Sequence, residues 1–472
     1  MSDVLRGLKP QRVFEIFEEI CAIPHGSGNT KAISDYCVGF AKQRGLSVYQ
    51  DSLNNVVIKK AATAGYETHL PVIIQGHLDM VCEKDADCDL NMETDGLRLF
   101  VDGDLVGAHG TTLGGDDGIA VAMALAVLDD NTLLHPPIEV LFTTDEETGM
   151  YGAEGLDVSV LSGKILINID SDNEGEFTVG CAGGARAEFS LPLKRCDISA
   201  PCYTVEISGL LGGHSGSAIN KGRQNSNVLM GKLLASFDFP YNIIDIAGGL
   251  KDNAIPTYTK CVVSADAPVD VLAAQFKADN TVSTDSGLNI TVKKSDDVAC
   301  GYTKESSEAI AEFLSTVPNG LLALSCQFEG LPETSLNLGV LYIENDSLHA
   351  SFAVRSAIGD KKKNLLSELR TFADKFGADY SERGHYPAWE YRAVSPLRDT
   401  FVNVWQNMYG NKPVVRATHG GLECGLFSDK IKGLDAISVG PDMFDIHTPR
   451  ERLSISSAQR TYEFLIAVLK EL

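Results

Sequence analysis

Apolar residues recur along the chain with two spacings, which predict where helices and strands form. An N-terminal stretch repeats apolar residues every three to four positions: Val13, Ile16, Phe17, Ile20 and Cys21. This spacing predicts an amphipathic helix that ends before Pro24, and a second helix is expected at about residues 30–45. Short apolar runs that predict strands follow at residues 48–49, 56–58 and 72–74. Strands and helices then alternate up to Asp170, which predicts an α/β sheet with helices on its faces.

The pattern changes after residues 181–184, where alternation of apolar and polar residues becomes the main signal. Strands are expected at residues 187–191 and 204–207, with helices near 226–237, 306–317 and 362–376. A helical pattern resumes at about residues 393–397. The middle of the chain therefore has a different architecture from its two ends.

The length, net charge and cysteine content of the chain limit its domain number, its partners and its cellular compartment. A chain of 472 residues exceeds one comfortable core, so two or three domains are expected. The formal net charge of −24 argues against nucleic acid or an anionic membrane as a partner, because phosphate binding needs clustered Lys and Arg. The eleven cysteines are dispersed and odd in number, which argues against a disulfide framework. No secretory signal is recognised, and the longest apolar run, 119–128, is too short to span a bilayer. These features predict a cytoplasmic protein.

Candidate metal ligands stand directly after apolar runs or at a helix start. His77 follows residues 73–76, the acidic pair Glu146-Glu147 follows the run 138–142, and Asp170 follows 164–169. The other two candidates are His447, in the loop after residues 436–440, and Asp116, which opens a long apolar helix after a Gly-Gly turn. Because ligands in an open α/β sheet gather at the carboxyl ends of its strands, these side chains can converge on one crevice. Two histidines and three carboxylates suit a pair of divalent cations, most plausibly zinc, and indicate a dinuclear metallohydrolase.

Each candidate also has a plainer interpretation. Asp116 and Asp170 could cap a helix and a turn, Glu146 and Glu147 could be acidic residues in a helical first turn, and His447 could be a structural loop histidine. These interpretations weaken together, since every member falls at an element end compatible with one crevice. One carboxylate of an adjacent pair can bind metal while its neighbour acts as a general base.

The spacing His77-x-Asp79 places both side chains on the same side of an extended backbone, where the carboxylate can orient the imidazole. A site built from residues at both ends of the chain implies a catalytic domain interrupted by an inserted one. We therefore expect the first part of the catalytic domain at residues 1–185, an inserted domain at 186–393, and the second part at 394–472.

Three motifs carry a family resemblance. The segments 76–81 (GHLDMV), 111–118 (TTLGGDDG) and 144–149 (TDEETG) are similar to the metal-site motifs of the carboxypeptidase-G-like dizinc peptidases. Within that clan the chain most resembles the aminoacyl-histidine dipeptidases, on segments 333–339, 253–256 and 419–425. The resemblance covers essentially the whole chain. It implies a zinc-exopeptidase-type domain with a central, mostly parallel sheet flanked by helices, interrupted by an inserted α+β lid domain.

The resemblance also implies a ligand set for two divalent ions, zinc with Mn²⁺ or Co²⁺ as substitutes. Asp116 would bridge the ions, His77 and Asp170 would complete one site, and Glu147 and His447 the other. Asp117 stands where many relatives have Asn, which adds a negative charge beside the bridge.

Catalytic and substrate-binding roles follow from the same resemblance. Asp79 would orient His77, and Glu146 would be the general acid/base. In the lid, His214 would polarise the scissile carbonyl, while Asn253 and Arg355 would hold the carboxylate end of the substrate. Taken alone, His214 would be interpreted as a turn histidine among glycines, Asn253 as a turn residue and Arg355 as a solvated strand charge.

The expected function is hydrolysis of short unblocked peptides, such as aminoacyl- or β-alanyl-histidine, by a metal-bridged water with Glu146 as general base. An N-acyl amino acid deacylase or a tripeptidase could use the same site. A non-catalytic metal-binding protein is the alternative from another class, although it would have no use for Glu146. The expected partner is a small peptide, and a homodimer stays open.

Overall fold

The computed structural model describes residues 3–296 and 298–472, which form two compact units. The first unit contains the chain up to Gly180 together with Tyr391–Ala417 and Leu422–Leu472. The second unit contains Cys181–Glu390 and the short segment Thr418–Gly421. The chain therefore leaves the first unit and returns to it, as the sequence analysis expects. The sequence-based boundaries lie at 185/186 and 393/394, a few residues from those of the structure, and they leave residues 418–421 in the second part of the catalytic domain. The assignment of the two units as catalytic and lid domains stays a prediction.

The first unit combines helices on both sides of the insertion with one large sheet. Its helices are α1 (Gln11–Cys21), α2 (Lys31–Gln43), α3 (Gly115–Asp129), α4 (Tyr151–Gly155), η1 (Val158–Val160), α9 (Pro396–Tyr409), α10 (Glu423–Lys430) and α11 (Ile455–Glu471). Its strands are β1 (Ser47–Gln50), β2 (Val56–Lys60), β3 (Val72–His77), β4 (Leu99–Asp102), β5 (Leu105–Ala108), β6 (Ile138–Thr143), β7 (Ile165–Asn168), β8 (Glu176–Cys181), β22 (Val414–Thr418), β23 (Asp435–Ser438), β24 (Met443–Phe444) and β25 (Arg452–Ser454).

The large sheet has the strand order β1-β2-β6-β3-β7-β23-β8-β22. The central pairs β6·β3, β3·β7 and β7·β23 are parallel, whereas β1·β2, β2·β6 and β23·β8 are antiparallel. Every residue of β3 and β6 is buried, which explains why these strands are rich in apolar residues and lack the regular alternation of a half-exposed strand. Parallel pairing thus occupies the centre of the sheet, where the predicted ligands follow the strands.

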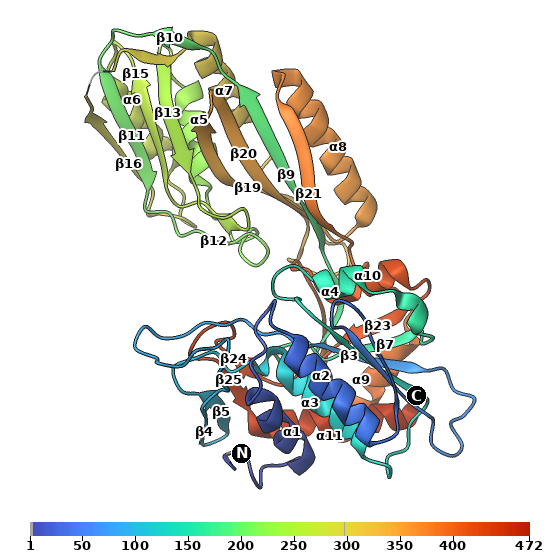
Figure 1. The fold of residues 1–472 in the computed structure, drawn as a ribbon. Helices are drawn as coiled ribbons and strands as arrows, with labels where there is room; N and C mark the ends of the chain where they lie inside the picture. Colours follow the sequence, from blue (N-terminus) through green and yellow to red (C-terminus); the bar gives the residue numbers. More distant parts are fainter. Residues whose placement is uncertain (1–2, 297) are drawn as a thin grey trace. The chain divides into compact units, whose positions relative to one another are not determined.

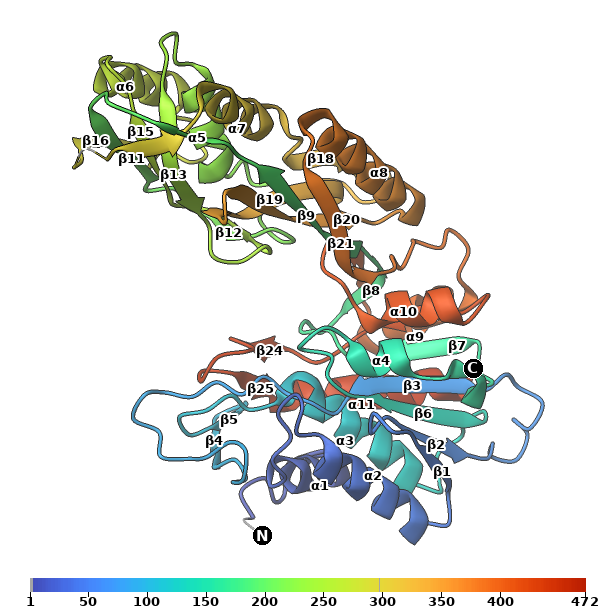
Figure 2. The ribbon, with the colours of Figure 1, turned by 45° about the horizontal axis from the view of Figure 1, so that its top comes forward.

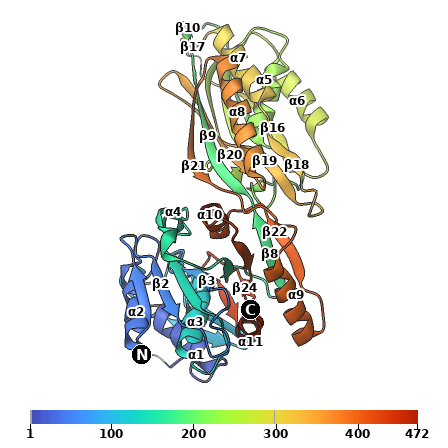
Figure 3. The same cartoon turned by 90° about the vertical axis from the view of Figure 1, so that its right-hand side faces the viewer.

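Helices pack against this sheet through their apolar residues. Helix α3 lies against β3 and is buried on all sides, since α1 covers it in turn. Helix α2 contacts β1 and β2 (Figure 2). Helices α9 and α10 contact β23. Strands β8 and β22 form one edge of the sheet, with α9 next to them (Figure 3). The α/β fold predicted from the sequence is confirmed.

The second unit is α+β. Its strands are β9 (Gly183–Pro192), β10 (Arg195–Asp197), β11 (Cys202–Ser208), β12 (Gly213–His214), β13 (Asn242–Gly248), β14 (Ala254–Ile255), β15 (Thr259–Ser264), β16 (Asn289–Lys294), β17 (Cys300–Tyr302), β18 (Gly320–Leu324), β19 (Pro332–Glu344), β20 (Ser347–Ser356) and β21 (Asp379–Tyr386). Its helices are α5 (Ser226–Ala235), α6 (Val269–Asn280), α7 (Lys304–Thr316) and α8 (Gly359–Phe376).

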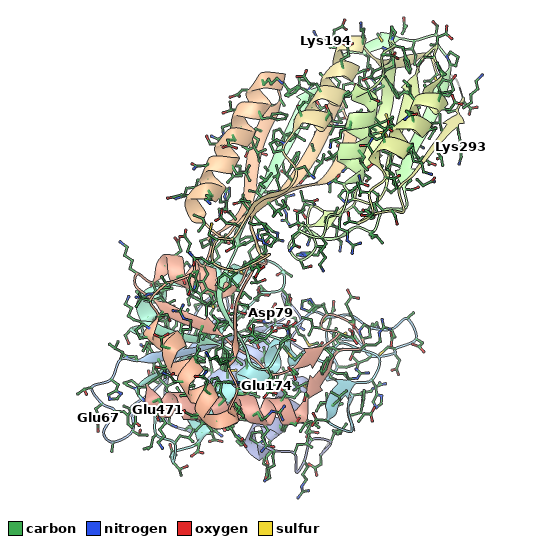
Figure 4. All side chains as sticks on the ribbon, turned by 180° about the vertical axis from the view of Figure 1, so that it is seen from behind. Glu67, Asp79, Glu174, Lys194, Lys293 and Glu471 are labelled. Carbon is green, nitrogen blue, oxygen red and sulfur yellow. The ribbon has the colours of Figure 1, made fainter. Side chains whose placement is uncertain are left out.

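A nine-stranded antiparallel sheet forms the body of this unit, in the order β16-β11-β15-β13-β19-β20-β9-β21 with β18 also beside β19. The helices α5 to α8 lie along its strands (Figure 1). In β9, buried Ala185, Ala187, Phe189 and Leu191 alternate with more exposed residues, so one face packs on the core and the other is solvated. Lys194 and Lys293 project from the periphery of this unit, as Glu67 and Glu471 do from the first (Figure 4). In the part of the chain that the structure describes, no helix is both long and apolar enough to cross a bilayer.

Candidate metal centre

The five predicted metal ligands all lie in the first unit. His77 is the last residue of β3, Glu147 follows β6 by four residues and Asp170 follows β7 by two. His447 lies between β24 and β25, in a loop that follows β23. Because β3, β6, β7 and β23 are neighbouring parallel strands, their carboxyl ends present these side chains at one edge of the sheet.

Asp116 lies between the two histidines. Its Oδ1 is 3.0 Å from Nε2 of His77, and its Oδ2 is 3.2 Å from Nε2 of His447. The helix proper does not begin at this residue, because Asp116 has an extended backbone (φ −82°, ψ 103°) after the left-handed Gly114. The carboxylate can therefore present one oxygen to each side, which a helical N-cap residue bonded to its own helix could not do.

Two ligand groups share Asp116. His77, Asp116 and Asp170 form one group, and Asp116, Glu147 and His447 form the other; within each, the candidate ligand atoms lie within 4.8 Å of one another. Nε2 of His447 is 2.8 Å from Oε1 of Glu147. This arrangement has the geometry of two adjacent cation sites with a common carboxylate.

Asp79 fixes the residues around these groups and lies within the first unit (Figure 4). The backbone carbonyl of Asp79 lies 2.9 Å from Nδ1 of His77, and its Oδ1 lies 3.5 Å from the same nitrogen. Oδ1 also accepts the backbone N–H of Glu146 at 3.1 Å. Its Oδ2 accepts the backbone N–H of Glu147 at 3.3 Å and the hydroxyl of Ser27 at 2.8 Å. Asp79 thus positions the imidazole of β3, chiefly through its carbonyl, and the acidic pair after β6 through its buried carboxylate.

Glu146 joins the cluster without belonging to either shared group. Its carboxylate forms a third close set with His77 and Glu147. Burial raises the pKa of Glu146 to about 8, with added repulsion from Glu423, Glu147 and Asp116. A carboxylate whose pKa lies near neutrality can both accept and return a proton.

Burial and neighbouring charges also shift the pKa values of three predicted ligands: Asp170, Asp116 and His447. Burial raises the pKa of Asp170 well above its usual value, and the charges of Asp116 and Asp117 act in the same direction. Burial also opposes ionisation of Asp116, but hydrogen bonds with His447 and His77 hold its pKa well below the usual range. Hydrogen bonds with Asp116 and Glu147 raise the pKa of His447 to about 10. Crowded, buried carboxylates repel one another, and divalent cations would relieve that repulsion, so the donor set fits a pair of them.

Glu451, which the sequence analysis did not single out, holds the loop of the bridging residue. Its two oxygens accept the backbone N–H groups of Leu113 (2.9 Å), Gly114 (3.2 Å), Gly115 (2.8 Å) and Asp116 (3.4 Å). The side chain is 2% exposed. Nothing in its neighbourhood in the sequence marks this role, because its partners are backbone groups.

A buried polar network ties the strand ends beneath the site. Glu423 accepts hydrogen bonds from Thr143 Oγ1 (2.7 Å) and Gln75 Nε2 (2.5 Å), and Gln75 accepts one from Asn168 Nδ2 (2.6 Å). These residues belong to or end β6, β3 and β7, so the network joins three strands that carry ligands. Burial raises the pKa of Glu423 to about 7. Glu423 lies in segment 419–425, which carries the family resemblance but suggested no role for it.

The three predicted lid residues lie in the second unit. His214 in β12 pairs with Ala254 in β14, and the carbonyl of Asn253 accepts the N–H of Ser215 at 2.8 Å, so His214 and Asn253 are neighbours. Burial and the charge of Arg355 lower the pKa of His214. Arg355 lies in β20, an interior strand, and donates to the hydroxyl of Tyr386 at 3.1 Å.

His419 completes this cluster, which the sequence analysis did not anticipate. Its carbonyl accepts a hydrogen bond from Arg355 Nη1 at 3.3 Å, and its Nε2 lies 2.7 Å from the hydroxyl of Ser335. The side chain is 3% exposed. Burial and the charge of Arg355 lower the pKa of His419 to about 4, so its ring is neutral at pH 7. Arg355 is then the fixed cation of the cluster.

A family model, a curated relative and solved structures all relate this chain to peptidases. A model of Peptidase family M20/M25/M40 matches residues 73–471. The chain is 36% identical over 480 aligned residues to the cytosol non-specific dipeptidase of Escherichia coli strain K12, with 99% of each protein covered. It is similar to the crystal structure of aminoacylhistidine dipeptidase from Vibrio alginolyticus, with 35% identity, a TM-score of 0.92, and coverage of 100% of this chain and 99% of that one. A tripeptidase from Staphylococcus aureus subsp. aureus Mu50 shares the fold, with 15% identity, a TM-score of 0.57 and 98% of each chain covered.

Proposed function

Because the chain belongs to Peptidase family M20/M25/M40, we propose that it is a cytosolic metallopeptidase that hydrolyses short unblocked peptides, above all dipeptides such as aminoacyl-histidine. The relatives named as dipeptidases align with it over nearly their whole length. The observation that carries the proposal is the pair of ligand groups that share Asp116, with Glu146 beside them. The confirmed family resemblance supports the same reading of the residues.

Two divalent cations, which we propose to be zinc, would be held by His77, Asp116 and Asp170 and by Asp116, Glu147 and His447. When bound, they supply Lewis acidity that polarises the scissile carbonyl and makes water a better nucleophile. Mn²⁺ or Co²⁺ would serve as substitutes.

Glu146 moves the proton in the proposed reaction. Its backbone is anchored to Asp79, which leaves the carboxylate directed to the ligand cluster. It takes a proton from the attacking water and returns it to the leaving amine, as a general base and then a general acid. Glu147, fixed by the same aspartate, remains a ligand.

In the proposed reaction, the second unit supplies two neutral polar side chains and one cation. We assign to His214 the polarisation of the scissile carbonyl, and to Asn253 and Arg355 the binding of the substrate's carboxylate. Arg355 supports this role because it is a cation next to two histidines with lowered pKa values. A neutral His214 can donate one ring N–H to an oxyanion.

A substrate panel tests the function. Zinc-loaded protein should hydrolyse dipeptides, with kcat/KM for tripeptides and N-acyl amino acids at least about tenfold lower, which corresponds to about 1.4 kcal/mol. Parallel assays with Mn²⁺ and Co²⁺ identify the best metal. Preferred turnover of N-acyl amino acids would establish a deacylase instead, and tight metal binding without any turnover would establish a binding protein.

A further inference from the structure

A cavity in the first unit adjoins the ligand cluster. Its volume is about 830 Å³, and Glu147 forms part of its wall. The lining comes from three segments: residues 26–29 after α1, residues 80–83 after β3 with 92–94 of the following loop, and residues 147–148 after β6. A volume of this order is typical of a small-molecule site. Since one wall is a proposed metal ligand, the cavity is continuous with the place of the reaction.

Hydrogen bonds fix these segments to one another and to the site. Ser27 donates its hydroxyl to Asp79 and its N–H to the carbonyl of Met80 at 3.3 Å. Gly28 donates its N–H to Asp145 Oδ1 at 2.6 Å, and Asn29 Nδ2 donates to the carbonyl of Glu93 at 3.1 Å. These hydrogen bonds preorganise the cavity wall, and one of them links it to Asp79 beside His77.

One part of the cavity wall is aliphatic and sulfur-containing. Met80 is 2% exposed, Met92 and Val81 are half-buried, and the thiol of Cys82 joins them. Methionine is flexible and polarisable, so such a wall adapts to unbranched side chains of different lengths.

Two carboxylates, Glu83 and Glu93, also line the cavity and are exposed. Neither forms an ion pair with Lys, Arg or His among residues 3–296 and 298–472. Lys84, the nearest cation in the sequence, directs its Nζ to the carbonyl of Leu90 at 2.9 Å. Burial, followed by the charges of Glu83 and Glu93, raises the pKa of the Cys82 thiol, which places both carboxylates near this wall.

We propose that this cavity receives the side chain of the substrate's N-terminal residue, and that Glu83 and Glu93 make it favour a cationic over an anionic side chain. The inference rests on the proposed function, in which Arg355 binds the carboxylate end and leaves the acidic cavity for the amino end. The aliphatic wall takes the methylene stem of lysine, and the exposed carboxylates meet its ammonium group.

Matched substrates test the charge preference. Lysyl-alanine is compared with norleucyl-alanine, its uncharged counterpart, and glutamyl-alanine with glutaminyl-alanine, at low ionic strength. The kcat/KM of the lysyl peptide should exceed that of the norleucyl peptide about fivefold to tenfold, and glutaminyl should exceed glutamyl by a similar factor. The double variant Glu83→Gln/Glu93→Gln should reduce both ratios to within about twofold of one. The control Asp85→Asn/Asp87→Asn removes the same charge from the same loop outside the cavity and should keep both ratios.

The wall is tested separately by Met92→Trp, which fills the cavity. It should lower kcat/KM for norleucyl-alanine at least about tenfold and for glycyl-alanine less than threefold, in line with the loss of a buried side-chain site. Three results would overturn the cavity assignment: kcat/KM ratios of one in the unaltered protein, ratios that the double variant does not change, or an equal loss for both peptides in Met92→Trp. Turnover of norleucyl-alanine would still uphold the peptidase function in each case. Absence of all dipeptide turnover in folded, metal-loaded protein would overturn the proposed function itself.

Discussion

Glu451 accepts the backbone N–H of Asp116 at 3.4 Å, across 335 positions of sequence. The same carboxylate accepts three further N–H groups from residues 113–115. Four donors on one buried carboxylate hold the turn that delivers the shared ligand, and the contact also joins the two parts of the first unit that the insertion separates.

Glu451→Gln should therefore weaken metal binding without removing a ligand. The amide keeps one acceptor oxygen and brings an NH₂ group against backbone donors. We expect the dissociation constant for zinc to rise about 10–100-fold, as for other residues that orient ligands. Competition with a chromophoric chelator measures it, with Glu471→Gln, at the surface of the C-terminal helix, as control. Unchanged affinity would show that the turn keeps its shape without this carboxylate.

Variants of Glu146 and Glu147, the acidic pair after β6, should distinguish the general base from the metal ligand. Glu146→Gln should retain metal and fold but lose about 10²–10⁴-fold in kcat, the usual worth of general acid–base catalysis. Glu147→Gln should instead lose metal, because Glu147 lies in the group of Asp116 and His447. Metal content and single-turnover rates distinguish the two variants. Exchanged phenotypes would reverse the assignment of the pair.

The sequence allowed the centre of the fold to be predicted because its strands are buried on both faces. β3, β6 and β7 are short apolar runs, and a chemically conspicuous residue follows each. The carboxyl-edge rule then brings His77, Glu147 and Asp170 together, and the structure does place them in close groups. The predicted fold class and family are confirmed; the roles of the individual residues stay predictions.

The contacts of Glu451, Glu423 and His419 could not be predicted from the pattern. Their partners are backbone N–H groups, buried amides and a serine hydroxyl that lie far away in sequence. The extended backbone of Asp116 was equally hidden, since a carboxylate after a Gly-Gly turn favours a helix cap from sequence alone. Such contacts depend on how distant segments pack, and hydrophobic periodicity carries no information about them.

Metal loading should be dinuclear and should release protons. Hydrogen bonds with Asp116 and Glu147 raise the pKa of His447 to about 10, so in the protein alone His447 holds a proton at pH 7 that metal must displace. Burial raises the pKa of Asp170 as well, which favours its protonated form in the absence of metal. Metal affinity should therefore increase as pH rises from about 6 to 8. Elemental analysis should give two zinc ions per chain, and calorimetry in buffers of different ionisation enthalpy should show net release of protons on metal binding. A stoichiometry near one in excess metal would contradict the shared role of Asp116.

His214→Ala should depress kcat about 10²–10³-fold, the usual cost of losing one oxyanion donor. Metal content should not change, because His214 lies outside the unit that holds the ligands. His349→Ala, a histidine elsewhere in the second unit, serves as control. A rise in KM with unchanged kcat would instead give His214 a role in ground-state binding.

His419 should make the protein less stable in mild acid. Burial and Arg355 lower its folded-state pKa from 6.5 to about 4, so below pH 6.5 the unfolded chain binds a proton that the folded one refuses. Stability from this residue is thus present above pH 6.5 and lost as pH falls through 4, on the order of 3 kcal/mol in total. Glutamine can keep a hydrogen bond to Ser335 but does not titrate. Between pH 7 and 4.5, metal-free His419→Gln should therefore lose less free energy of unfolding in urea than the unaltered protein. His385→Gln, whose side chain is 47% exposed, should follow the unaltered protein. If all three proteins lose the same free energy, His419 must gain its proton in the folded state as readily as in the unfolded chain.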